Sequence, residues 1–218
     1  MNEIKAVFFD LDNTLLDRTE GAYRTFRYFL TSVLKVDPDT VYGEALVQDM
    51  MNWDGYGNIR KNFITECLKK DYGYDTGDLD FAFWWYHHLC LFEEKFPEAD
   101  EVMEYLSKKY RLAILTNGDH FSQTNKVSRN KLDRYVEFTL ISADIGSHKP
   151  EPLMYQMALE KMGIEPQEAV YVGDTFGKDI LGAYNVGIRP IWIWPQDGRR
   201  CLEQITRINR LSDLMNIL

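Results

Sequence analysis

Five short apolar runs, each ending at a polar or glycine-containing turn, dominate the hydrophobic pattern of the chain. They are residues 4–9, 111–116, 136–142, 168–172 and 188–194, of which 136–142 is the weakest. Runs of this length between turn residues are typical of buried strands. Three helical stretches separate the last four runs: 121–132, which is polar, 151–163, which has apolar residues at helical spacing, and 178–187. Strands that alternate with helices predict an α/β, Rossmann-like core with a parallel sheet between two helical layers.

The stretch from residue 18 to residue 96 interrupts this alternation. It carries several helical patterns, and no convincing strand separates them. About 80 residues is far more than a crossover between parallel strands needs. We therefore expect an inserted helical domain at 18–96, and a core formed by 1–17 and 97–218.

Composition narrows the choice of partners and compartment. The net charge of −9 argues against nucleic acid or an anionic membrane as the main partner, although a phosphate can still bind locally. The cysteines Cys67, Cys90 and Cys201 lie far apart, which is typical of free thiols in a reducing compartment. The chain shows neither a signal peptide pattern nor an apolar run long enough to span a membrane, so we expect a cytoplasmic protein.

Polar side chains with catalytic potential gather at the ends of the predicted strands. They are Asp10 and Asp12 after the first strand, Thr116 and Asn117 after the second, Lys149 before helix 151–163, and Asp174 and Asp179 after run 168–172. Ligands of open parallel sheets bind at this edge, so we expect these side chains to converge. Closely spaced carboxylates are stable with a bound cation or a retained proton, and oxygen ligands beside a phosphate suit Mg²⁺. The set indicates phosphoryl transfer.

Each of these residues also has an ordinary explanation when it is taken alone. Asp10 and Asp12 could be a turn and helix-capping pair, and Thr116 could simply precede a turn. Lys149 could be a surface lysine, and Asp179 a surface charge on a helix. The joint occurrence of all of them, in this order, favours chemistry.

Four segments resemble the sequence motifs of hydrolases of the haloacid dehalogenase superfamily. They are FFDLDNTLLD, LTNGD, HKPEP and YVGDTFGKDILGAYNVG, and they occur in the order of the family. The resemblance covers roughly residues 4–17 and 97–195, and the helical insert is similar to the cap domain of the family. Residues 52–63 loosely resemble a segment of its pyrimidine 5′-nucleotidase branch.

The resemblance implies the roles of the two aspartates that follow the first strand. Asp10 would be the nucleophile that forms an aspartyl-phosphate. Asp12 would be the general acid that protonates the leaving oxygen, and later the base that activates water. Dehalogenases of the family lack a carboxylate at this second position, so Asp12 favours a phosphatase or a phosphomutase.

The resemblance also assigns binding roles. Thr116, the Asn117 backbone and Lys149 would bind the phosphate, and Lys149 would also steady Asp10. Magnesium would be held by Asp10, by the backbone carbonyl of Asp12 and by Asp174. Asp179 and Thr14 would support these groups without touching the substrate.

A Mg²⁺-dependent phosphatase is therefore the expected function, acting on a small phosphate monoester such as a nucleoside monophosphate. A phosphomutase and a catalytically idle binding protein remain alternatives. We expect a monomer or a homodimer. Weaker candidates for substrate contact are His148, Arg60 and the aromatic group Trp84, Trp85 and Tyr86, for which ordinary surface or core positions are the better explanations. His87 and His88 are adjacent on a predicted helix and so do not share a face for a metal.

Overall fold

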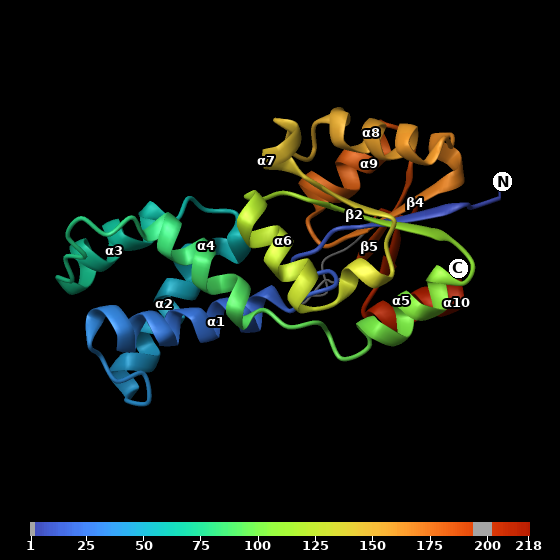
Figure 1. Ribbon diagram of the computed structural model, residues 1–218. Coiled ribbons are helices and arrows are strands. Elements are labelled where there is room, and N and C mark those ends of the chain that lie inside the picture. Colours follow the sequence, from blue (N-terminus) through green and yellow to red (C-terminus); the bar gives the residue numbers. More distant parts are fainter. Residues whose placement is uncertain (1–2, 194–201) are drawn as a thin grey trace. The chain divides into compact units, whose positions relative to one another are not determined.

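The computed structural model describes residues 3–193 and 202–218 and divides into two compact units (Figure 1). The core unit is Met1–Asp17 with Lys95–Leu218, and the helical unit is Arg18–Glu94. Trp194 in the last apolar run and the third predicted thiol, Cys201, lie outside the described residues. The role of the helical unit as a cap stays a prediction.

A six-stranded parallel sheet, in the order β3-β2-β1-β4-β5-β6, forms the centre of the core unit. Its strands are β1 (Ala6–Phe9), β2 (Arg111–Thr116), β3 (Phe138–Ile141), β4 (Ala169–Gly173), β5 (Arg189–Ile193) and β6 (Thr206–Ile208). All four residues of β1 are fully buried between β2 and β4, which explains its uniformly apolar sequence. The strand order reverses at β1, the place where such sheets bind ligands. The predicted α/β class is confirmed.

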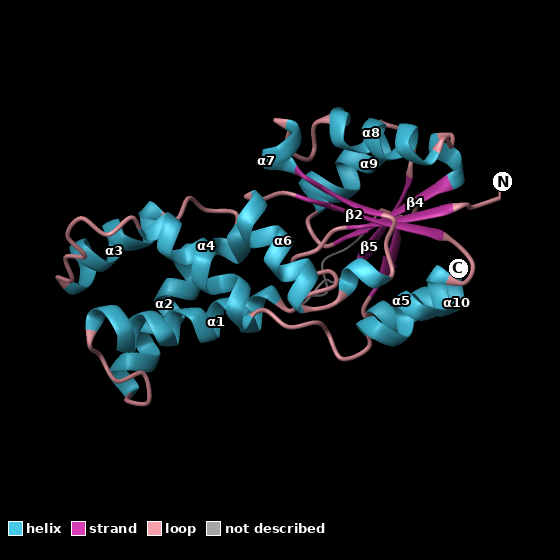
Figure 2. Ribbon diagram, in the orientation of Figure 1, coloured by secondary structure: helices cyan, strands magenta, loops and turns pink. Residues whose placement is uncertain are grey.

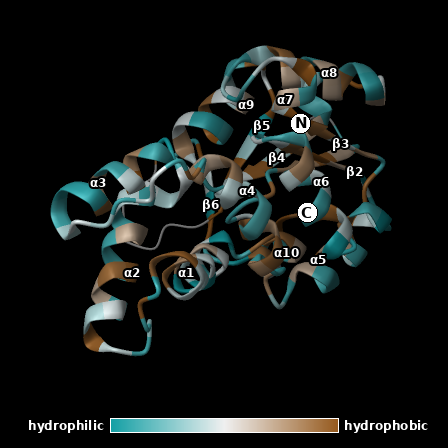
Figure 3. Ribbon diagram, turned by 60° about the vertical axis from the view of Figure 1, so that its left-hand side comes forward, coloured by the Kyte–Doolittle hydropathy of each residue, from teal (hydrophilic) through white to brown (hydrophobic). Residues whose placement is uncertain are grey.

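Helices cover both faces of this sheet (Figure 2). One face carries α8 (Pro152–Met162) and α9 (Leu181–Asn185), which pack in a cluster that includes Phe8 and Tyr171. Residues on α5 (Ala99–Ser107), α6 (His120–Arg129) and α10 (Leu214–Ile217) pack on the other face in a cluster that includes Val7 and Phe9. Because side chains alternate along a strand, β1 serves both layers. The helices mix hydrophilic and hydrophobic residues, as expected when only one side of each is buried (Figure 3).

Short elements complete the core unit. They are α7 (Ser142–Ile145), the 3-10 turns Leu132–Arg134, Pro166–Glu168 and Leu211–Asp213, and a π-helical turn at Phe176–Ile180. The weak run at 136–142 forms only the four-residue strand β3, because α7 begins at Ser142. Strand β6 has three residues, too few for its alternation to be recognised in the sequence.

The helical unit contains α1 (Arg18–Phe29), α2 (Val41–Asp54), α3 (Asn62–Tyr72) and α4 (Phe81–Phe92), with a π-turn at Leu30–Leu34 and a 3-10 turn at Gly55–Gly57. All residues from 18 to 94 are described, and none lies in a strand. Phe26 and Trp85 pack in its core with their ring centres 4.4 Å apart and their planes tilted by 35°. Across residues 3–193 and 202–218, no helix combines the length and the apolar character that crossing a bilayer requires.

Candidate active site

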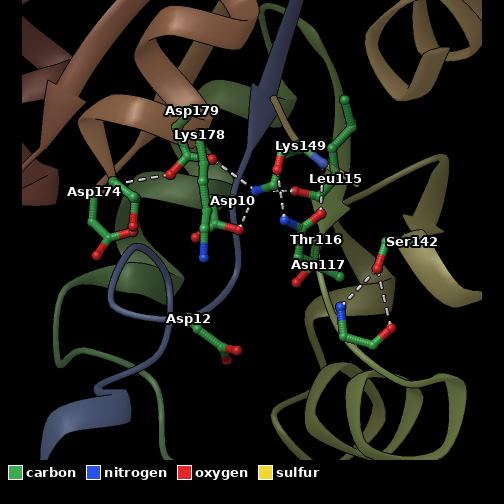
Figure 4. A network of polar contacts seen from close by, with 12 residues as sticks. Asp10, Asp12, Leu115, Thr116, Asn117, Ser142, Lys149, Asp174, Lys178 and Asp179 are labelled. Carbon is green, nitrogen blue, oxygen red and sulfur yellow. Dashed lines mark hydrogen bonds and ion pairs between the residues drawn. The ribbon is translucent and has the colours of Figure 1, made fainter. Parts of the chain in front are cut away.

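The ammonium of Lys149 is the centre of a buried polar network at the carboxyl ends of β1, β2 and β4 (Figure 4). Its Nζ lies 2.6 Å from Asp10 Oδ1, 2.7 Å from Asp179 Oδ1, 2.8 Å from the hydroxyl of Tyr171 and 2.9 Å from the carbonyl oxygen of Leu115, so four oxygens share its three N–H groups. Burial alone would lower the pKa of Lys149, but the carboxylates of Asp10 and Asp179 outweigh it and raise that pKa. Lys149 is therefore a permanent cation.

The side chain of Asn117 fixes the backbone of Lys149. Asn117 Oδ1 accepts from the Lys149 backbone N–H at 2.9 Å, and its Nδ2 donates to the Lys149 carbonyl at 3.1 Å. These two hydrogen bonds tie the loop before α8 to the end of β2. The predicted contact between the Asn117 backbone and a phosphate stays a prediction.

Three carboxylates lie close together beside this lysine. Oxygens of Asp10, Asp174 and Asp179 all lie within 4.8 Å of one another. Asp179 is fully engaged, because Oδ1 accepts from Lys149 and Tyr171, and Oδ2 accepts from the Thr175 N–H at 2.9 Å. Asp174 accepts from the Thr175 hydroxyl at 3.1 Å through Oδ1. Among the described residues, Oδ2 of Asp10 and Oδ2 of Asp174 accept no hydrogen bond.

The electrostatics of these carboxylates fit a divalent cation. Burial raises the pKa of Asp10 to about 7, with Asp179 and Asp12 adding to the effect and Lys149 opposing it. Burial, together with Asp10 and Asp179, raises the pKa of Asp174 well above its usual range. Such carboxyl groups ionise readily only when a cation offsets their repulsion, and oxygen ligands suit a hard ion such as Mg²⁺. The donor set is therefore able to hold a metal through Asp10 and Asp174.

Asp12 lies apart from this lysine and has partners of its own. Its Oδ1 and Oδ2 accept from Lys126 Nζ at 2.9 and 3.0 Å, and Oδ2 also accepts from Gln123 Nε2 at 3.4 Å. The same Gln123 nitrogen donates to the hydroxyl of Thr116, which is almost fully buried at the end of β2. One amide group thus contacts both the predicted general acid and the predicted phosphate-binding hydroxyl.

A family model for haloacid dehalogenase-like hydrolases matches residues 7–193 of the chain. The chain belongs to this family. The glyceraldehyde 3-phosphate phosphatase of Pyrococcus furiosus is 31% identical to it over 198 residues, which cover 88% of this chain and 81% of that protein. The N-acylneuraminate-9-phosphatase of Rattus norvegicus is 27% identical over 212 residues, covering 88% of this chain and 84% of that protein.

A solved 2-haloacid dehalogenase from Pseudomonas syringae pv. Tomato DC3000 has the same architecture. It is 29% identical, covers 98% of this chain and 97% of its own, and superposes with a TM-score of 0.64. The resemblance recognised in the four motifs is confirmed at the level of the family.

Sequence reasoning missed two residues of this haloacid dehalogenase-like hydrolase that contact the site. Gln123 and Lys126 are both 2% exposed, on a helix that the sequence analysis treated simply as polar. They share a helical face with Val127 and Asn130, since the spacing is i, i+3, i+4 and i+7. Polar residues at helical spacing, directly after LTNGD, could have indicated that this helix buries a polar face.

The supporting residues of the hydrolase differ in how they are held. The indole N–H of Trp192 donates to the backbone carbonyl of Asp174 at 2.7 Å and so fixes the loop after β4. Thr14 is fully buried, and its backbone N–H donates to the Leu11 carbonyl at 3.4 Å. Within residues 3–193 and 202–218 its hydroxyl has no hydrogen-bond partner. The predicted supporting role of Thr14 stays a prediction.

The weaker candidates of the hydrolase lie in ordinary environments. His148 is exposed, and Arg60 is an exposed residue that pairs with Glu66 at 2.9 Å. Trp85 is buried in the core of the helical unit, whereas Trp84 is half-buried. His87 and His88 each bind the carbonyl four residues earlier on their own helix.

Proposed function

We propose that this hydrolase is a Mg²⁺-dependent phosphatase that cleaves small phosphate monoesters through an aspartyl-phosphate on Asp10. One observation carries the proposal: Lys149 holds one oxygen of Asp10 at 2.6 Å, and the other oxygen accepts no hydrogen bond among the described residues. A carboxylate oriented in this way has a defined oxygen with which to attack phosphorus.

Residues of the chain perform the steps. Asp10 Oδ2 forms a bond to phosphorus as the bond from phosphorus to the leaving oxygen breaks, and Asp12 gives that oxygen a proton. Asp12 then takes a proton from the water that hydrolyses the aspartyl-phosphate. Lys149, Thr116 and the Asn117 N–H bind the phosphoryl oxygens. Asp10, Asp174 and the backbone carbonyl of Asp12 would hold Mg²⁺, which would neutralise charge on the phosphoryl group.

Asp12 favours phosphate chemistry over dehalogenation. A halide leaves without a proton, so a dehalogenase needs no acid at this position, whereas a departing alkoxide does. The structural similarity to the 2-haloacid dehalogenase therefore supports the fold and the family. The presence of Asp12 supports a phosphatase within that family. Two relatives are named glyceraldehyde 3-phosphate phosphatase and N-acylneuraminate-9-phosphatase. Their names support the hydrolysis of a small phosphate monoester.

The test is a screen for released phosphate with the purified protein and Mg²⁺. The panel contains glyceraldehyde 3-phosphate, N-acylneuraminate 9-phosphate, phosphoglycolate and nucleoside monophosphates, with EDTA and Asp10→Asn as controls. Release from at least one compound, abolished in both controls, is expected. The absence of release from every compound would instead favour a binding protein. Isomerised product from a hexose 1-phosphate with trace bisphosphate, and little free phosphate, would favour a phosphomutase.

Several finer statements stay predictions. The helical unit is proposed to act as the cap that selects the leaving group. The choice of a nucleoside monophosphate as the substrate rests on the weak resemblance of residues 52–63 to the pyrimidine 5′-nucleotidase branch. The monomeric or homodimeric state, the cytoplasmic location and the lack of nucleic acid or membrane partners also remain predictions.

A further inference from the structure

Lys126 is a buried charge for which the mechanism above has no use. Its side chain is 2% exposed, in the middle of α6, and its ammonium contacts both carboxylate oxygens of Asp12 at 2.9 and 3.0 Å. Burying an ammonium is costly, and well-packed apolar residues often replace a buried ion pair without loss of stability. The position of Lys126 therefore points to a role other than holding the fold together.

Gln123 supports the same carboxylate one turn earlier on the helix. Its Nε2 lies 3.4 Å from Asp12 Oδ2 and also donates to the Thr116 hydroxyl. Gly118 makes room for it, because a Cβ at that position would lie 2.8 Å from Gln123 Cγ and Cδ. The glycine of the LTNGD segment thus allows the helix to reach Asp12.

The helix that carries both residues is anchored on either side of them. The Asp119 side chain caps its first turn by accepting from the Ser122 N–H at 2.8 Å. Asn130 donates to the Lys126 carbonyl at 3.0 Å and accepts from the Lys95 N–H at 3.0 Å. These contacts fix the backbone of α6 that carries Lys126, and the hydrogen bond from Gln123 to Thr116 ties the helix to the end of β2.

We infer that Lys126 and Gln123 are positioning residues that orient Asp12 for proton transfer to the leaving group. The inference rests on the proposed function. Lys126 contacts both carboxylate oxygens of Asp12 and acts through that residue. As the bond between Asp10 and phosphorus forms and the bond to the leaving oxygen breaks, that oxygen takes the proton of Asp12. A carboxyl group held by two donor groups, Lys126 and Gln123, has one orientation for this transfer.

The test compares two leaving groups in Lys126→Met. 4-Nitrophenyl phosphate has a leaving group that needs no proton, whereas the best alkyl monoester from the screen does. The ratio kcat/KM reports the steps up to phosphorylation of Asp10, so the acid matters only for the alkyl ester. Lys126→Met should lower kcat/KM about 10- to 100-fold for the alkyl ester and less than about threefold for 4-nitrophenyl phosphate.

Controls separate positioning from folding. Arg129→Met removes a positive charge from an exposed site on the same helix and should leave both values unchanged. Lys126→Arg keeps the charge and should restore part of the loss. If circular dichroism shows that Lys126→Met does not fold, Lys126→Gln replaces it in the same comparison. Added to Asp12→Asn, the substitution should cause no further loss with the alkyl ester.

The outcomes divide clearly between the two proposals. Equal losses with both substrates, or an additive loss in the Asp12→Asn background, would overturn the positioning role while the phosphatase proposal stands. If the unaltered protein cleaves neither substrate nor any other monoester, the proposed function fails and this inference fails with it.

Discussion

Each unit of the molecule buries a cluster of charged side chains, and the clusters are built in opposite ways. In the core unit, one ammonium, Lys149, contacts Asp10 and Asp179, and Asp174 lies close by. In the helical unit, one carboxylate, Asp54, pairs with two cations.

The pKa values of the carboxyl groups follow this difference. Burial opposes ionisation of Asp54, but Arg18 at 2.8 Å and Lys61 outweigh it and lower the pKa of Asp54. Burial raises the pKa of Asp10 to about 7 because a single lysine cannot offset both burial and the neighbouring carboxylates. A carboxylate whose charge is neutralised by neighbouring cations supports structure. Where carboxylates outnumber cations, the uncompensated negative charge is available to bind a metal and to take part in a reaction.

The largest effect is expected from Asp10→Asn. It removes the proposed nucleophile, so turnover should fall by roughly 10⁴-fold or more. The free energy of unfolding should not decrease, because the substitution removes a carboxylate from a repelling group. Phosphate release and urea unfolding measure the two quantities. Full activity in this variant would contradict the role of Asp10.

Asp54→Asn should have the opposite character, with a large effect on stability. It leaves the guanidinium of Arg18 and the ammonium of Lys61 buried without their counter-charge, at a cost of about 3–5 kcal/mol in the free energy of unfolding. Urea unfolding followed by circular dichroism tests this. Asp75→Asn, which removes an exposed carboxylate that pairs with Lys69 in the same unit, is the control and should change little. Equal effects would show that the Asp54 cluster is not structural.

Magnesium should stabilise the core unit. At about 100 times its dissociation constant, a ligand that binds only the folded state adds about 2.7 kcal/mol to the free energy of unfolding. Asp174→Asn removes a proposed ligand and should abolish most of this gain, whereas Asp54→Asn should retain it. Urea unfolding with and without Mg²⁺ measures the gain, and an undiminished gain in Asp174→Asn would exclude this metal site.

The pH dependence of stability should differ in sign between the clusters. The pKa of Asp10 rises from 3.8 to about 7 on folding, so without metal its contribution to stability falls as pH rises through this interval. The pKa of Asp54 is lowered from 3.8, so its contribution is present above that value and is lost as pH falls through the lower folded pKa.

Unfolding in urea with EDTA from pH 4 to pH 7 measures the Asp10 effect. Asp10→Asn should remove a downward slope of at most about 1.4 kcal/mol per pH unit, the value for one proton. An unchanged slope in this variant would show that Asp10 is ionised throughout.

Local patterns predicted most of the fold, because apolar runs report burial directly. The run at 4–9 contains the fully buried strand β1, and the predicted parallel sheet is present. Partners across long distances could not be predicted in this way. Lys126 is 114 residues from Asp12 in the chain, so no local pattern links them. Tyr171 looked like part of an apolar strand, yet its hydroxyl contacts Lys149.

Gly118 has a consequence for how this protein can change. Every other residue type adds a Cβ that would meet Gln123, and Gln123 contacts both Thr116 and Asp12. Any amino-acid substitution at position 118 would therefore disturb both the proposed phosphate-binding hydroxyl and the proposed general acid at once. We therefore expect few substitutions to be tolerated at position 118 as the protein adapts to new substrates. More variation should be tolerated at residues that contact only one other group.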